Sequence, residues 1–93
     1  MAIASFRCSE TRALFEGGKA PRFANIRSVL ERKLAMLEAA HVLLDLRMPP
    51  GNRLEALSGD RAGQHSIRVN DQFRVCFGWT AEGPADVECV DYH

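Results

Sequence analysis

Hydrophobic positions recur with a helical period in the first half of the chain and with a two-residue period in the second half. Between residues 24 and 44, apolar side chains stand three or four positions apart, and charged residues occupy the other faces. This stripe consists of Ile26, Leu30, Leu34, Leu37 and, in line with them, His41. The spacing predicts one long amphipathic helix with His41 at the edge of the core.

Shorter elements precede and follow this helix. Residues 3–6 alternate weakly and predict a first strand, while Ser9 is placed to cap a short helix over Glu10–Glu16. After two prolines at 49 and 50, the two-residue period predicts strands at residues 53–57, 64–69, 72–79 and 87–92. A strand, two helices and then an antiparallel sheet predict a single α+β domain over residues 1–93.

The parity of the apolar positions predicts how the strands on either side of residue 70 pair. A two-residue loop would align apolar with polar positions and mix the two faces of the sheet. A three-residue loop at 70–72 aligns Val69 with Phe73 and Ile67 with Val75, and a five-residue loop is equivalent. We therefore expect a hairpin of this register.

The same register places Arg68 directly opposite Arg74, on the face away from the aromatic core. Like charges that face each other across a ladder cost a few tenths to about 1 kcal/mol. Two interpretations stay open. Either an anion such as a phosphate lies between the guanidinium groups, or each arginine pairs with a carboxylate such as Glu55, Asp71 or Asp86.

Composition narrows the class of protein. Apolar residues make up 46% of the chain, no apolar stretch is long enough to span a membrane, and no signal peptide is evident, so we expect a cytoplasmic protein. Cys8, Cys76 and Cys89 lack the spacing of metal ligands, so we expect reduced thiols, no metal and no cofactor. The net charge of zero disfavours strong nucleic-acid binding, yet ten of the twelve basic residues are arginine, which suits bidentate phosphate contacts.

Three motifs, in this order, resemble those of the HigB-type toxins, a branch of the RelE-like superfamily found in bacterial toxin–antitoxin pairs. They are Leu54–Arg61 (LEALSGDR), Ser66–Phe77 (SIRVNDQFRVCF) and the C-terminal Asp91-Tyr92-His93. The resemblance extends over essentially the whole chain. It implies a RelE-like α+β fold in which two N-terminal helices pack on a small antiparallel sheet.

The resemblance also implies an activity and a set of partners. The activity is that of a ribosome-dependent mRNA endoribonuclease, in which the ribose 2′-hydroxyl attacks the adjacent phosphate without a metal or another cofactor. The implied partners are the ribosome, its mRNA and a helix-turn-helix antitoxin of the HigA type. Operator DNA is reached only through the antitoxin, which represses the shared operon.

Candidate catalytic residues follow from the resemblance. Arg74 matches the family's arginine that stabilises the transition-state phosphate, and Arg68 is an approximate match for a second arginine. Asp91, Tyr92 and His93 match the C-terminal triplet, which can transfer protons, stack on a base or orient an arginine.

Other positions depart from the family pattern. Glu55 stands where some members have histidine, and it is either the general base or a plain arginine partner. Asn70 stands where some members have the second arginine, and we include it with Arg53 and Arg61 among the predicted RNA contacts.

Lost positive charge leaves an alternative function open. Ser58 and Gly78 are neutral at positions that are often basic in the family. Together with the neutral total, this favours, as the alternative, a catalytically weak or inactive member that binds an antitoxin and acts as a co-repressor. A free-standing RNA-binding domain is a third hypothesis, which a neighbouring antitoxin gene would contradict.

Overall fold

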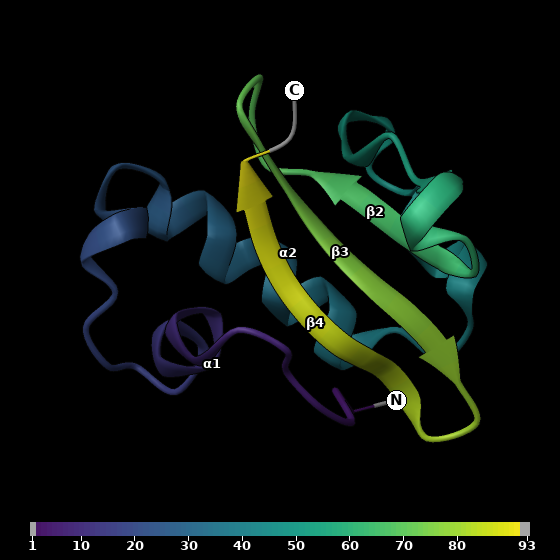
Figure 1. Ribbon diagram of the computed structural model, residues 1–93, viewed down its shortest axis with the longest axis horizontal. Coiled ribbons are helices and arrows are strands. Elements are labelled where there is room, and N and C mark those ends of the chain that lie inside the picture. The colour runs from purple at the N-terminus through teal and green to yellow at the C-terminus, as the bar shows by residue number, and fades with distance from the viewer. Residues whose placement is uncertain (1, 92–93) are drawn as a thin grey trace.

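The structure is a computed structural model and describes residues 2–91. Four antiparallel strands form one sheet, α2 lies behind it and α1 lies beside β4 (Figure 1), so the predicted α+β class is confirmed. None of the helices among these residues is long and apolar enough to cross a membrane. The elements are α1 (Ser9–Phe15), η1 (Pro21–Ile26), α2 (Arg27–Ala39), η2 (Leu43–Arg47), η3 (Pro50–Asn52), β1 (Glu55–Ala56), η4 (Gly59–Arg61), β2 (Gln64–Arg68), β3 (Phe73–Thr80) and β4 (Gly83–Asp91).

The core lies between α2 and one face of the sheet. Leu30, Leu34 and Leu37 on α2 are fully buried, and they belong to the same cluster as Ile67 and Val75 of the sheet. Each fully buried leucine side chain contributes roughly 1.5–3 kcal/mol through removal of its surface from water. The predicted apolar stripe is therefore the contact between the helix and the sheet.

The C-terminal end of the predicted long helix is wrong. Regular α-helix stops at Ala39, and Ala40 adopts extended backbone angles. The carboxylate of Asp45 accepts hydrogen bonds from the amides of His41 and Val42 at 2.9 and 3.1 Å, which stabilises a separate turn. His41 consequently lies exposed at the surface rather than at the edge of the core.

The N-terminal strand predicted at residues 3–6 is reduced to one isolated parallel bridge between Phe6 and Val87. Backbone hydrogen bonds of 2.7–3.1 Å join this segment to the carbonyls of Pro84 and Val87 and to the amide of Val87. A longer ladder does not form because Pro84 has no amide proton and Asp86 has a positive φ of 52°.

The cap predicted for α1 is also wrong. Cys8, not Ser9, is the N-cap, and its Sγ accepts a hydrogen bond from the amide of Thr11 at 3.5 Å. The hydroxyl of Thr11 is buried and accepts a hydrogen bond from the amide of Cys89 at 3.1 Å. This bond attaches α1 to β4.

The strand order is β1-β2-β3-β4, and the predicted register of the central hairpin is confirmed. Ile67 pairs with Val75 and Arg68 pairs with Arg74, which leaves a loop of residues 70–72. The strand predicted at residues 53–57 is shorter than expected, because Arg53 has left-handed backbone angles (φ 45°, ψ 55°) that end the extended segment.

Candidate active site

The face of the sheet away from α2 carries the arginines predicted to bind phosphate. Antiparallel pairing aligns Glu55, Ser66, Cys76 and Glu88 in one row across the four strands, which we call the carboxylate row. Ser66 and Cys76 in the middle are fully buried. The side chains at the two ends are more open, since Glu55 is 49% and Glu88 15% exposed. Small side chains therefore form a floor between two carboxylates.

Arg74 lies beside this floor, and groups of Ser66, Arg53 and Glu55 hold its guanidinium. Nε donates to Ser66 Oγ at 2.8 Å, and Nη2 donates to the carbonyl oxygen of Arg53 at 2.7 Å. An oxygen of Glu55 lies 3.7 Å from Nε, and the Arg74 side chain is only 12% exposed. A cation fixed in this way needs little reorganisation to stabilise negative charge that develops on a phosphate.

Arg68 faces Arg74 across the hairpin, and each arginine has a carboxylate partner. Nη2 of Arg68 contacts Oδ1 of Asp71 in the loop, where the Asp71 side chain is fully exposed. With Glu55 beside Arg74, this arrangement is the second of the two interpretations of the arginine pair. The carboxylates reduce the repulsion between the guanidinium groups without a bound anion.

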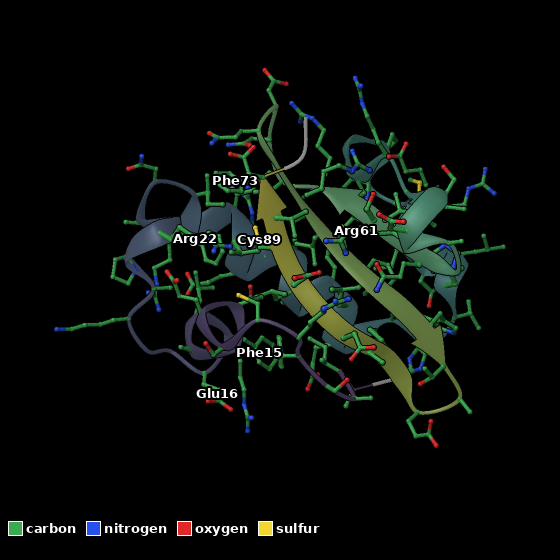
Figure 2. All side chains as sticks on the ribbon, viewed as in Figure 1. Phe15, Glu16, Arg22, Arg61, Phe73 and Cys89 are labelled. Atoms are coloured by element: carbon green, nitrogen blue, oxygen red, sulfur yellow. The ribbon has the colours of Figure 1, made fainter. Side chains whose placement is uncertain are left out.

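Arg61 forms an ion pair with Glu88, the end of the carboxylate row opposite Glu55. Its Nη1 donates to Gln64 Oε1 at 3.0 Å and to Glu88 Oε1 at 2.9 Å, and in Figure 2 the side chain reaches from η4 toward β4. Glu88 and Gln64 were not predicted as members of the site. The available clue to Glu88 was the alternation with Val87 and Cys89, both buried in the core, which places Glu88 on the opposite face.

Cys76 lies beneath these charged side chains. Burial raises the pKa of its thiol, and the nearby charges of Arg61 and Glu88 have smaller, opposing effects on that pKa. A buried thiol that stays protonated is a poor nucleophile. Cys76 is therefore a neutral part of the floor and not a reacting group.

Two residues predicted to contact RNA also have structural roles. Asn70 Oδ1 accepts hydrogen bonds from the amides of Gln72 and Phe73 at 2.8 and 2.7 Å, which is the side-chain pattern that stabilises a tight loop. Arg53 is exposed, and its backbone carbonyl holds Arg74. Both residues therefore shape the surroundings of the arginine pair.

Asp91 lies at the end of β4, away from the carboxylate row. It pairs with Phe73, whereas Val90 pairs with Arg74, so the register places Asp91 on the face of Phe73. Gln72 Nε2 donates to Asp91 Oδ2 at 3.0 Å. An open pocket of about 550 Å³ adjoins this strand end and is lined by Arg22, Gln72, Phe73, Val90 and Asp91, of which Figure 2 labels Arg22 and Phe73.

The last two predicted members of the site, Tyr92 and His93, lie outside the residues that the structure describes. Their roles, like that of Asp91, stay predictions based on the resemblance. Within residues 2–91, no group of three or more His, Cys, Asp or Glu side chains could hold a metal ion.

Comparison with known proteins assigns the chain to a family. Residues 4–93 match the family described as the RelE-like toxin of the type II toxin–antitoxin system HigB. Toxin HigB-1 of Vibrio cholerae is 52% identical over 70 residues, which cover 75% of this chain and 73% of that toxin. An uncharacterised protein of Haemophilus influenzae is 44% identical over 54 residues, which cover 58% of this chain and 54% of that protein.

A solved structure supports the fold independently. The YoeB/ParE toxin from Agrobacterium tumefaciens aligns with a TM-score of 0.57 and 16% sequence identity, and the alignment covers 100% of both chains. At this identity the likeness is evidence for the fold alone. The family match over residues 4–93 and the identity to Toxin HigB-1 show that this chain belongs to the HigB-like, RelE-like toxins of type II toxin–antitoxin systems.

Proposed function

We propose that the chain is a ribosome-dependent mRNA endoribonuclease that cleaves in the decoding site without a metal. The family is one of ribonuclease toxins, and the finer mechanism is our inference from the site. The observation that supports it is the Arg74 guanidinium, held by Ser66, the Arg53 carbonyl and Glu55 on the open face of the sheet.

The proposed reaction needs three groups. A base takes the proton of the ribose 2′-hydroxyl, whose oxygen then attacks the adjacent phosphorus. A cation stabilises the extra negative charge, and an acid protonates the 5′-oxygen as the P–O5′ bond breaks and a 2′,3′-cyclic phosphate forms. Glu55 is the proposed base and Arg74 the proposed cation, and their separation of 3.7 Å suits two groups that act on neighbouring atoms.

The acid is assigned on the resemblance alone. Asp91, Tyr92 and His93 are the candidates, and of these we favour His93 because imidazolium is a good proton donor near neutral pH. Tyr92 then stacks on a base or donates to the phosphate, and Asp91 orients one of its neighbours.

The charge distribution supports dependence on the ribosome. Arg61, Arg68 and Arg74 each have a carboxylate partner, and the whole chain is neutral. Affinity for RNA rises with the number of phosphates that a protein neutralises, so this chain alone should bind RNA weakly. The ribosome would supply the affinity and present the mRNA, while the toxin supplies the fixed groups.

The partners and the compartment follow from this function. A type II toxin has a cognate antitoxin, and we propose an antitoxin of the HigA helix-turn-helix type that links the toxin to operator DNA. We place the activity in the cytoplasm because translating ribosomes are there.

Induction of this chain alone, with primer extension on a translated message, tests the proposal. Growth arrest and cuts within codons are expected for the wild type, and neither is expected for Arg74→Ala. Arg47→Ala is the matched control, because Arg47 is exposed on η2 and lies outside the site. A folded wild type that neither arrests growth nor cuts mRNA would contradict the nuclease and favour the antitoxin-binding co-repressor.

A further inference from the structure

Asn52 is a fully buried polar residue in the loop that leads into the sheet. Its Nδ2 donates to the carbonyls of Leu46 and Met48 at 3.1 and 3.3 Å. Its Oδ1 accepts a hydrogen bond from Lys33 Nζ at 2.5 Å. One amide side chain thus connects α2 to the segment between η2 and β1.

Lys33 is the second unusual member of this contact. It lies on α2 among leucines that face the core, and it is 9% exposed. Burial lowers the pKa of Lys33, and the charges of Arg32 and Arg68 lower it further. A buried ammonium is costly without a partner, so the hydrogen bond to Asn52 compensates part of its desolvation.

The residue that follows Asn52 contacts the site directly. Arg53 is a non-glycine residue with φ 45° and ψ 55°, and its amide donates to the carbonyl of Pro50 at 3.1 Å. This left-handed conformation is unfavourable for a residue with a side chain, and it persists only where the surroundings enforce it. It accompanies the 2.7 Å bond from Arg74 Nη2 to the carbonyl oxygen of Arg53.

We propose that Lys33 and Asn52 are positioning residues for Arg74: they hold the loop in the conformation that aims the Arg53 carbonyl at the guanidinium. The order of contacts is Lys33 to Asn52, the adjoining peptide of Arg53, and then Arg74. Neither Lys33 nor Asn52 touches the open face on which RNA would lie. For its effect on cleavage, this inference rests on the proposed function.

Without the Lys33 contact, Asn52 keeps its Nδ2 bonds to the carbonyls of Leu46 and Met48 but loses its charged donor on α2, so the loop should shift relative to α2. The Arg53 carbonyl would then leave the guanidinium, and Arg74 would sample several orientations while its charge stayed the same. Displacement of a catalytic group by about an ångström can cost on the order of 100-fold in rate. KM on the ribosome should change much less than kcat, because Lys33 is buried on α2 and donates to Asn52 rather than to RNA.

Lys33→Met is the test variant, since methionine fills a similar space without the charge or the donor. Lys19→Met, at the only other lysine, is the matched control because Lys19 is exposed. Lys33→Gln restores a neutral donor. Each full-length protein is measured for the thermal midpoint, for kcat and KM on mRNA-programmed ribosomes, and for the Nε–H signal of Arg74 in ¹⁵N NMR spectra.

The proposal expects Lys33→Met to stay folded with a thermal midpoint lowered by no more than about 10 °C. It should lose roughly 10- to 100-fold in kcat with KM nearly unchanged, and its Arg74 signal should shift or broaden. Lys33→Gln should recover part of both losses, and Lys19→Met should match the wild type. An unchanged Arg74 signal in a folded Lys33→Met protein overturns the proposal, whatever happens to kcat.

Two outcomes are interpreted separately. If wild type does not cleave, the proposed function fails, and the Arg74 signal alone still decides the positioning role. If Lys33→Met does not fold, Lys33→Gln takes its place, because it removes the charge and keeps a donor for Asn52 Oδ1, and a shifted or broadened Arg74 signal is again the expected result. If that protein also fails to fold, the pair serves stability and the positioning proposal is overturned.

Discussion

Substitution of Arg74 by lysine keeps the positive charge and removes the planar fork of donors. The guanidinium uses Nε for Ser66 Oγ and Nη2 for the Arg53 carbonyl, whereas the single ammonium of lysine cannot take both positions. At least one hydrogen bond from a charged donor is lost in a side chain that is 12% exposed. Such a bond contributes roughly 1.5–3 kcal/mol.

Two effects of Arg74→Lys can be measured separately. The free energy of unfolding should fall by about that amount, which for a domain of this size lowers the thermal midpoint by roughly 10 °C. Cleavage on ribosomes should fall by about 10²–10³-fold in kcat, the usual effect of removing one preorganised donor to a developing oxyanion. Single-turnover cleavage and thermal unfolding, both at one ionic strength, give the two values.

Arg47→Lys is the control for a general effect of the substitution, because Arg47 is an exposed arginine outside the site. Wild-type kcat in Arg74→Lys would refute the argument, since it would mean that charge alone suffices and that the fixed geometry has no role. Wild-type stability with reduced kcat would refute only the assigned contribution of the hydrogen bonds to folding.

Further predictions concern carboxylates and thiols around the site. If Glu55 is the base, Glu55→Gln should lower kcat by about 10²–10⁴-fold. The thermal midpoint should change little, because the Glu55 side chain is half exposed. Retained cleavage would assign the base elsewhere. Asp71→Asn should leave the unfolding free energy nearly unchanged, because the Asp71 side chain is exposed. Since Arg68 loses its carboxylate partner, the slope of log affinity for the ribosome against log salt concentration should become steeper by about 1. An unchanged slope would show that Arg68 contacts no phosphate. Backbone hydrogen bonds from His41 and Val42 lower the pKa of Asp45. The stability advantage of wild type over Asp45→Ala should therefore be present above the ordinary aspartate pKa and disappear as pH falls through the lowered pKa. Urea titrations across acidic pH that find a constant difference in unfolding free energy would contradict this. Burial raises the pKa of Cys89 to about 12 and also raises that of Cys76, so iodoacetamide at about pH 8 should label half-exposed Cys8 first in the native protein, and equal labelling by mass spectrometry would show that the core opens readily.

Parity predicted the sheet because both of its faces constrain the register. Ile67 and Val75 must share the buried face, and a shift by one residue would expose them while it buried Arg68 and Arg74. The facing arginines therefore follow from the pattern of apolar positions alone. The pattern of apolar positions does not identify the carboxylate partner of each arginine, because it does not distinguish among Glu55, Asp71 and Asp86.

Periodicity was less reliable where local hydrogen bonds decide the backbone. His41 continues the stripe of Leu37, yet the helix ends because Asp45 binds the two amides that follow Ala40. A helical period cannot reveal such a competing bond from a side chain to the backbone.

The loop before β1 shows the same limit more strongly. Asn52 and Arg53 read as ordinary loop residues, and neither periodicity nor motif spacing indicates that one is buried or that the other has a positive φ. Their importance depends on contacts with Lys33 and Arg74, which lie 19 and 21 positions away in the chain. Tertiary contacts of irregular backbone therefore set the details of the site that sequence patterns could not predict.

Net charge is a poor guide to such a site because it counts charges without regard to where they are held. Arg61, Arg68 and Arg74 each lie next to a carboxylate. Each pair therefore adds nothing to the net charge, although its guanidinium group occupies a defined position. Each partner weakens the long-range attraction of RNA and at the same time restricts the orientations of its arginine. In the proposed function the toxin meets its substrate on the ribosome, so the second property matters more than the first. The proposed function then predicts that the same pairs limit cleavage of free RNA, because a substrate that arrives without the ribosome finds little uncompensated charge to bind.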